Sequence, residues 1–185
     1  RKLCVTILHG QNKDALTKSQ LGSWQYDIVE AGYKMNMTDI LASIGLVELE
    51  RYDSDTLKQR RMVCEAYNKG LSQYDWAMVP KFERRGITSS YHLYQLRIKG
   101  IGEEQRNRIM ERIFAHDVSV NVHFIPVPML SYYKSLGYNM KDYPSTYAMY
   151  SNEISLPVFY DITEDQVKRV IEAVTESVTE EMSRA

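Results

Sequence analysis

The stretch Tyr91-His92-Leu93-Tyr94-Gln95-Leu96-Arg97-Ile98 decides which class of fold the chain is expected to adopt. Its side chains alternate with a period of two, which is typical of a β-strand that buries one face. The residues expected on one face are His92, Tyr94, Leu96 and Ile98. Residues 118–124 alternate in the same way, with Val118, Val120, Val122 and Phe124 on one face and Ser119, Asn121 and His123 on the other. Pro126 and Pro128 should end this second strand, because proline donates no ladder hydrogen bond.

Segments of helical periodicity surround these two strands. Residues 103–116 are expected to form a helix between them, with an inner face of Ile109, Met110, Ile113 and Phe114. Upstream, Thr38 is a good N-cap for a helix with the apolar residues Ile40, Leu41, Ile44, Leu46, Val47 and Leu49. That face is wide enough to predict burial on more than one side. The next helix should begin at Asp53 or Ser54 and end near Gly70, with Leu57, Cys64, Tyr67 and Leu71 inside.

The two ends of the chain complete the expected fold. Residues 3–8 read as a short apolar strand, and the tyrosine-rich residues 131–152 as a loop with short helices. A capping box, Thr163 to Gln166, predicts the start of the last helix, with a core stripe of Val167, Val170, Ile171 and Val174. The polar tail, residues 179–185, is expected to fray. The sequence therefore predicts an α+β fold in which helices cover one face of a small, mainly antiparallel sheet.

Composition narrows the class of function. The 185 residues carry 23 Lys and Arg against 24 Asp and Glu, so charge gives no reason to expect nucleic acid or an anionic membrane as partner. No apolar run is long enough to cross a bilayer, and the two cysteines fit a reducing compartment. A cytoplasmic protein is therefore expected. Because position 1 is Arg1 and not methionine, the chain is expected to be a piece of a longer protein.

No local catalytic motif occurs in the sequence: there is no glycine-rich phosphate loop, no HExxH, no nucleophile elbow and no CxxC pair. The four histidines lack metal-ligand spacing, so no metal site is predicted. His123 is the histidine of most interest, because it lies on the polar face of a predicted strand beside a proline-rich loop.

Five longer strings, in order along the chain, resemble those of the DegT/StrS family of sugar aminotransferases. Gly32-Tyr33-Lys34-Met35-Asn36-Met37-Thr38-Asp39-Ile40, followed by Ala42, Gly45 and Leu46, resembles the family signature G-Y-N-Y-R-M-T-D-I-x-A-A-x-G-L. Tyr91-His92-Leu93-Tyr94 resembles W-H-L-Y, and Val122-His123-Phe124-Ile125-Pro126-Val127 resembles V-H-Y-I-P-V. Ile154-Ser155-Leu156-Pro157-Val158 and Thr163-Glu164-Asp165-Gln166-Val167 resemble L-S-L-P-L and T-x-x-Q-V.

The resemblance implies the C-terminal part of a fold type I enzyme that depends on pyridoxal 5'-phosphate. Residues 1–37 would be the tail of the large cofactor-binding domain with an inter-subunit loop, and residues 38–185 the small C-terminal α+β domain. The Schiff-base lysine would lie upstream of Arg1, so the chain would hold no catalytic residue and would be inactive alone. The implied reaction converts a nucleotide-linked keto-sugar to an amino-sugar for polysaccharide or glycoconjugate synthesis, with glutamate as amino donor and a homodimer as the working form.

The same resemblance assigns candidate site residues. Lys34 takes the place of the family asparagine that contacts the cofactor phosphate, and Asn36 takes that of the family arginine. Trp24 and Tyr26 would line the sugar pocket of the partner subunit, and His123 would face the substrate cleft. Each assignment has an alternative without a role in the site. Lys34 would be a solvated loop residue, Asn36 would only shape the turn, and Trp24 and Tyr26 would belong to an ordinary hydrophobic interface. Pro128 replaces a second family histidine, which leaves the identity of the sugar open.

Two other functions remain open. One is a cofactor-free binding or regulatory domain, which the replacements at Lys34, Asn36 and Pro128 keep open. The other is a sugar dehydratase of the same family that uses pyridoxal phosphate, in which a histidine replaces the Schiff-base lysine. Upstream sequence would separate these classes.

Overall fold

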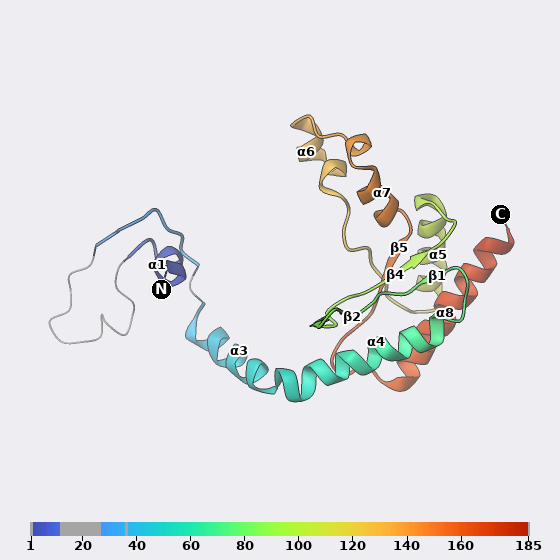
Figure 1. Ribbon diagram of the computed structural model, residues 1–185, viewed down its shortest axis with the longest axis horizontal. Helices are drawn as coiled ribbons and strands as arrows, with labels where there is room; N and C mark the ends of the chain where they lie inside the picture. Colours follow the sequence, from blue (N-terminus) through green and yellow to red (C-terminus); the bar gives the residue numbers. More distant parts are fainter. Residues whose placement is uncertain (1, 12–26, 36, 185) are drawn as a thin grey trace. The chain divides into compact units, whose positions relative to one another are not determined.

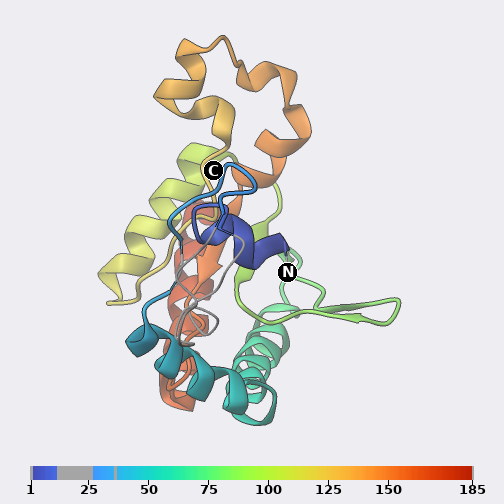
Figure 2. The same cartoon turned by 90° about the vertical axis from the view of Figure 1, so that its left-hand side faces the viewer.

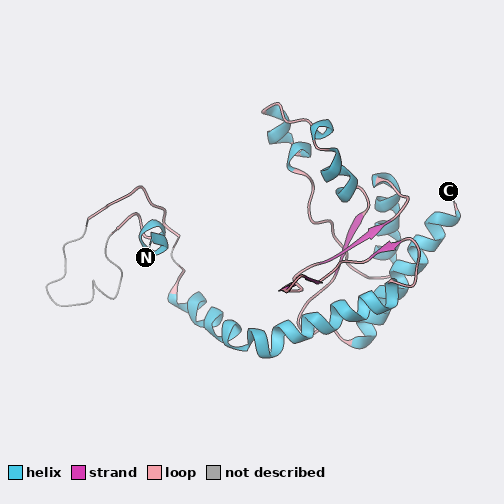
Figure 3. Ribbon diagram, in the orientation of Figure 1, coloured by secondary structure: helices cyan, strands magenta, loops and turns pink. Residues whose placement is uncertain are grey.

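The computed structural model describes residues 2–11, 27–35 and 37–184, which belong to two compact units, residues 1–51 and 52–185 (Figure 1). Most of its regular structure is helical, and the strands, in magenta in Figure 3, are short. Among the described residues, no helix combines the length and the apolar character that a membrane crossing requires.

The first unit begins with a helix, α1 (Lys2–Ile7), so the strand predicted at residues 3–8 is wrong. A six-residue apolar run fits either structure by periodicity alone, and only Leu8 makes a β-bridge, to Lys34. Tyr33 N donates to Thr6 O at 2.7 Å, and Met35 N donates to Ile7 O at 3.0 Å, which fixes residues 33–35 beside the end of α1. The two segments approach so closely that a Cβ added at Gly10, where φ is +75°, would lie 1.8 Å from Glu30 O.

The next helix among the described residues of this unit is α3 (Asp39–Arg51). Its start agrees with the predicted cap, because Leu41 N donates to Thr38 Oγ1 at 3.4 Å. The predicted burial is wrong for the chain as it stands, since no residue of α3 is buried. Ile40, for example, is 76% exposed and Leu49 is 71% exposed. The apolar face predicted from the sequence exists, but no described part of the chain covers it.

The second unit is built on a three-stranded antiparallel sheet in the order β1-β4-β5. These strands are β1 (Ala77–Met78), β4 (Tyr94–Ile98) and β5 (Glu153–Leu156). The helices α4 (Leu57–Leu71), α5 (Glu103–Ala115) and α8 (Glu164–Ser183) supply most of the other residues of the buried cluster. Figures 1 and 2 show them grouped around the sheet. The predicted α+β class with a small antiparallel sheet is confirmed.

The core confirms the predicted alternation of β4. Tyr94, Leu96 and Ile98 are fully buried, as are Cys64, Tyr67 and Leu71 on the predicted inner face of α4. The buried hydroxyls of the two tyrosines have partners: Tyr67 donates to Pro157 O at 2.9 Å, and Tyr94 donates to Asn68 Oδ1 at 2.8 Å. Burying each of these large side chains contributes about 1.5–3 kcal/mol to stability.

Several predicted details around the core are wrong. Asp53 and Ser54 do not begin a helix, because they lie inside a π-helical turn, η1 (Tyr52–Thr56). His92 is exposed, because Tyr91 adopts a positive φ of 52° and breaks the alternation before β4 begins. On α5, Ile109 and Ile113 are buried as predicted, but Phe114 is 47% exposed and Arg106 is buried instead.

The second predicted strand is reduced to one bridge, from Asn121 to Ser155. Val118 and Val120 are buried as predicted, whereas Phe124 is 73% exposed. The segment leaves the sheet after Asn121, so the period of two no longer decides which side chains are covered. Beyond Asn121, the side chains of Gln95 and Glu153 hold the backbone of this segment at His123.

Two further segments project from the sheet. A hairpin of β2 (Glu83–Arg84) and β3 (Ile87–Thr88) turns at Arg85 and Gly86, both with positive φ, and extends away from α4 (Figure 2). The tyrosine-rich segment folds as predicted into short helices: η2 (Val127–Met129), α6 (Ser131–Ser135), η3 (Met140–Asp142) and α7 (Pro144–Tyr150).

The last helix begins at the predicted capping box. Gln166 N donates to Thr163 Oγ1 at 3.2 Å, and Thr163 N donates to Gln166 Oε1 at 2.8 Å. The predicted fraying from residue 179 is wrong, because α8 continues to Ser183. Glu181, near its end, is only 4% exposed and binds two arginines of α5, Arg108 and Arg112.

Candidate functional site

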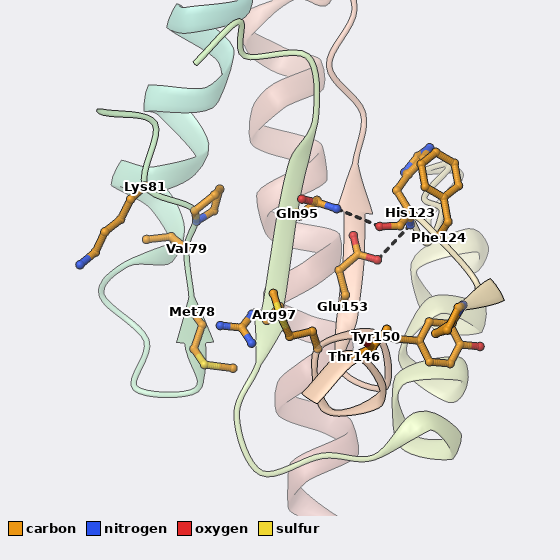
Figure 4. A pocket seen from close by; sticks show the side chains of 13 residues that line it. Met78, Val79, Lys81, Gln95, Arg97, His123, Phe124, Thr146, Tyr150 and Glu153 are labelled. Carbon is orange, nitrogen blue, oxygen red and sulfur yellow. Dashed lines mark hydrogen bonds between the residues drawn. The ribbon is translucent and has the colours of Figure 1, made fainter. Parts of the chain in front are cut away.

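The candidate site lies on the face of the sheet opposite the core. Because side chains alternate along a strand, Gln95 and Arg97 of β4 point away from the buried Tyr94, Leu96 and Ile98. The antiparallel register pairs Gln95 with Ser155 and Arg97 with Glu153 of β5. This polar face is the floor of a pocket of about 530 Å³ (Figure 4). Its walls include the apolar residues Met78, Val79, Pro80, Phe124, Pro126 and Met149.

His123 lies at this pocket, and its backbone is held on both sides by the sheet. Its N–H donates to Glu153 Oε2 at 3.1 Å, and its carbonyl accepts from Gln95 Nε2 at 2.9 Å (Figure 4). These two side chains replace the ladder bonds that the segment gives up when it leaves the sheet. The ring packs edge-on against Phe124, with centroids 4.6 Å apart. Its Nδ1 is buried and has no hydrogen-bond partner within the described chain.

Glu153 is a buried acid, only 5% exposed. Besides the bond from His123 N, its Oε1 accepts a hydrogen bond from Ser155 Oγ at 2.5 Å. Burial raises the pKa of the Glu153 carboxyl, and the hydrogen bonds from Ser155 and His123 oppose that rise without cancelling it. Both carboxylate oxygens are thus engaged inside the protein.

Arg106 fixes the backbone that leads into Glu153. It is 2% exposed, and its Nη1 donates to Tyr150 O and to Glu153 O, both at 3.2 Å. The guanidinium carbon also lies 4.8 Å from the centroid of the Tyr150 ring. The arginine therefore ties α5 to the junction where α7 ends and β5 begins, and so sets the position of the pocket floor.

Arg97 differs from these neighbours. It is half-buried at the centre of the pocket floor, and within the described chain its guanidinium has no hydrogen bond or ion pair. Its cross-strand neighbour Glu153 directs its carboxylate to Ser155 and His123. Lys81 lies at the rim, and Figure 4 shows its ammonium directed away from Arg97.

The other predicted site residues lie elsewhere in the chain. Lys34 belongs to the first unit, where its backbone bridges to Leu8 and its side chain is exposed. Its neighbours Tyr33 and Met35 are 64% and 68% exposed. Asn36, Trp24 and Tyr26 lie outside the described residues. Their predicted roles, like those of Lys34 and His123, stay predictions.

Sequence reasoning missed Gln95, Arg97, Glu153 and Arg106. A signal for two of them was present, because Gln95 and Arg97 alternate with the core residues of a correctly predicted strand. Glu153 belongs to a four-residue strand with every residue buried, so it gives no alternation to read. Arg106 gave no signal either, since an arginine in a helix is usually solvated.

Similarity to known proteins agrees with this architecture. The DegT/DnrJ/EryC1/StrS aminotransferase family is matched over residues 2–175. The spore coat polysaccharide biosynthesis protein SpsC of Bacillus subtilis is 35% identical over 181 residues, which are 96% of this chain and 46% of SpsC.

Solved structures give the same result. Spr1654 from Streptococcus pneumoniae, named as a sugar aminotransferase, matches in its PMP-form with 41% identity and a TM-score of 0.86, over 96% of this chain and 44% of that one. The PLP-form of Spr1654 matches with a TM-score of 0.84 and 37% identity, over 96% and 42% of the two chains. The aminotransferase PseC from Helicobacter pylori, at 17% identity, shares the fold with a TM-score of 0.79, over 97% of this chain and 46% of its own.

The chain therefore has the fold of the C-terminal portion of a PLP-dependent sugar aminotransferase. The chain belongs to the DegT/DnrJ/EryC1/StrS aminotransferase family. It spans about half the length of the curated relatives it matches.

Proposed function

We propose that this chain is the C-terminal part of an aminotransferase that converts the keto group of a nucleotide-linked sugar to an amine, for polysaccharide or glycoconjugate synthesis. The observation that carries the proposal is the family match over residues 2–175. The role that the name of SpsC states supports polysaccharide synthesis, and the PLP-form and PMP-form of Spr1654 support the cofactor. Pyridoxal phosphate, when bound, is the electron sink that lets an amino group pass between two carbon skeletons.

The residues of this chain fit one part of a cofactor site. Lys34 offers an exposed ammonium on a backbone that two hydrogen bonds to α1 residues hold in place. An ammonium is a suitable point-charge partner for a phosphate dianion. We assign Lys34 to the cofactor phosphate and place the lysine that bonds to the cofactor outside this chain. Asn36 remains a second candidate for the same contact.

His123 is assigned to the substrate. Its backbone is clamped by Gln95 and Glu153, while Nδ1 lacks a partner within the described residues. A buried ring nitrogen without a partner is costly, and a substrate hydroxyl or amine that approached it would remove that cost. Trp24 and Tyr26 are assigned to the sugar pocket of a partner subunit, as the family resemblance implies.

The working form is proposed to be a cytoplasmic homodimer with glutamate as amino donor. The first unit supports an assembly of some kind, because Ile28, Val29, Tyr33, Met35 and Met37 are all more than half exposed. Several exposed apolar side chains within one short segment are typical of a surface that another protein or another part of the same protein covers.

The test uses the full-length protein that contains this chain, loaded with pyridoxal phosphate. The expected result is a yellow protein that loses its colour when glutamate is added and regains it when a nucleotide-linked keto-sugar follows. A protein that stays colourless after loading would contradict the proposal and favour a cofactor-free binding domain. A coloured protein that does not respond to any amino donor, with histidine at the position of the cofactor-bonding lysine, would instead identify a dehydratase.

A further inference from the structure

We propose that the Arg97 guanidinium is an oxyanion-binding group for substrate in the pocket on the polar face of the sheet. The inference rests on the proposed function, because it assigns a ligand class to a site of the same protein. The two anionic groups that such an enzyme handles are the diphosphate of a nucleotide-linked sugar and the carboxylate of an amino donor. A guanidinium binds either one with two parallel N–H···O bonds.

The position of Arg97 suits a fixed binding group. It lies on β4, the central strand of the three, between Met78 of β1 and Glu153 of β5 in the register of the sheet. The same strand buries Tyr94, Leu96 and Ile98 completely on its other face. A side chain on such a strand is held more rigidly than one on a loop, which favours specific recognition.

The charge of Arg97 is not neutralised by its surroundings. Glu153 is opposite in register, but its oxygens accept hydrogen bonds from Ser155 Oγ and His123 N. Burial also raises the pKa of the Glu153 carboxyl, which disfavours its negative form. Gln95, the other polar residue of the strand, has its amide engaged with His123 O. The nearest polar groups are thus occupied with one another.

The arginines of the helices show the contrast. Arg61 binds Glu65 and Glu83, Arg108 binds Glu181, and Arg169 binds Asp117. Arg106, although fully buried, has backbone carbonyls and a tyrosine ring as partners. Arg97 alone among these five is half-buried within a pocket without a partner in the described chain.

The pocket walls strengthen any ion pair formed there. Met78, Val79, Phe124 and Met149 surround the floor with apolar groups. Such walls lower the local dielectric constant, so a contact between Arg97 and an oxyanion is stronger than on an open surface. His123 lies at the same pocket, so a substrate whose anionic end meets Arg97 would present its neighbouring groups to the histidine.

The experiment compares Arg97→Gln and Arg97→Lys in the full-length, cofactor-loaded protein, with Lys168→Gln as charge-matched control. Lys168 lies on the exposed side of α8 and pairs only with exposed Asp165 in the described chain. The donor half-reaction and the keto-sugar half-reaction are measured separately. We expect Arg97→Gln to raise the KM of one substrate by about tenfold or more, with kcat little changed, because a charge-assisted hydrogen bond is lost. Arg97→Lys should recover part of that affinity.

The two half-reactions identify which oxyanion Arg97 binds. A higher KM for the donor alone assigns Arg97 to a carboxylate, and a higher KM for the keto-sugar alone assigns it to the diphosphate. If both KM values stay within about twofold of the parent protein while the parent turns over, the inference is wrong and the proposed function stands.

A binding measurement decides the case in which the parent shows no activity, which would be a failure of the proposed function. Inorganic pyrophosphate and glutarate are titrated against the full-length protein and the same variants by calorimetry. Weaker binding of either probe to Arg97→Gln, and not to Lys168→Gln, supports the inference. Equal binding by all the proteins, or none by the parent, overturns it. Thermal unfolding of each variant checks that it folds. If Arg97→Gln does not fold, Arg97→Lys takes its place in the binding comparison.

Discussion

Glu153 shows how one side chain links the stability of this domain to its pocket. It is an acid enclosed between Ser155 and the backbone of His123, and its pKa is raised by burial. An acid with a raised pKa binds its proton more tightly in the folded state. The free energy of unfolding should therefore be unaffected by Glu153 at low pH, where both states are protonated. It should fall as pH rises from the ordinary carboxyl pKa through the raised one.

The comparison with Glu153→Gln tests this direction. The amide keeps an acceptor for His123 N but cannot ionise, so the variant should gain stability relative to the parent as pH increases from 4 to 8. Urea unfolding of both proteins across this range, about 4 to 8, measures the difference and cancels other titrating groups. A difference that is flat with pH, or that falls, would show that the Glu153 carboxyl is not destabilised by burial.

The contacts of individual residues are the feature that the sequence predicts least well. The strand pattern predicts His123 on a polar face, yet Phe124 next to it is 73% exposed and the predicted strand is not formed. The histidine reaches the pocket because Gln95 and Glu153 hold its backbone. Such side chain to backbone bonds depend on residues about 30 positions away, at separations of 28 and 30, which no local pattern encodes.

At the scale of elements, the pair α5–α8 is closed by a clamp on Glu181. Its oxygens accept from Arg108 Nη2 and Arg112 Nη1, both at 2.6 Å, and these bonds lower the pKa of the carboxyl. Glu181→Ala should reduce the free energy of unfolding by about 1–3 kcal/mol, because charge-assisted bonds are lost from a buried site. Glu180→Ala, on a half-exposed neighbour that also pairs with arginines, should cost no more than about 1 kcal/mol. Equal costs in denaturant unfolding would refute a buried clamp.

Helices α4 and α8 meet at Gly70, where an added Cβ would force the side chain of Ile171 to shift. A Cβ there would lie 2.7 Å from Ile171 Cδ1 and 3.1 Å from Ile171 Cγ2. Gly70→Ala should therefore fail to give the stabilisation of about 1 kcal/mol that alanine brings to a helix interior. In an Ile171→Ala background the same substitution should become stabilising. A double-mutant cycle by chemical unfolding measures this coupling, which we expect to exceed about 0.5 kcal/mol; additive effects would mean that the helices separate freely at this point.

The elements that sequence predicted well are those with a strong local signal. The capping box at Thr163 and the inner face of α4 both follow from contacts within a few residues, and both are observed. The strands predicted at residues 3–8 and 118–124 are not formed, because a short apolar or alternating run forms a strand only if a partner strand is available. The clamp on Glu181 connects residues about 70 positions apart, at separations of 73 and 69, so the polar tail looked free when read alone.

At the scale of the whole molecule, the two units differ in how well they cover their apolar residues. The second unit has a continuous buried cluster of residues from α4, α5, α8 and the sheet. In the first unit α3 has no buried residue, although it carries the large apolar residues Ile40, Leu41, Ile44, Leu46, Val47 and Leu49. The chain spans about half the length of its relatives. Contacts with residues outside this sequence would cover α3 and so account for the contrast.

The isolated 185-residue chain is therefore expected to self-associate through α3. Leu41 and Ile44 are 58% and 57% exposed, so exposing them to water in a monomer is unfavourable and their burial between copies is favourable. The double substitution Leu41→Lys and Ile44→Lys should shift the chain toward monomer in sedimentation velocity, without changing the unfolding of the second unit. Ser43→Lys, on the same helix, adds a charge without removing apolar surface and should leave the association unchanged. A parent chain that sediments as a monomer at all concentrations would show that the exposed face of α3 does not drive association, whereas equal effects of the two variants would trace association to charge.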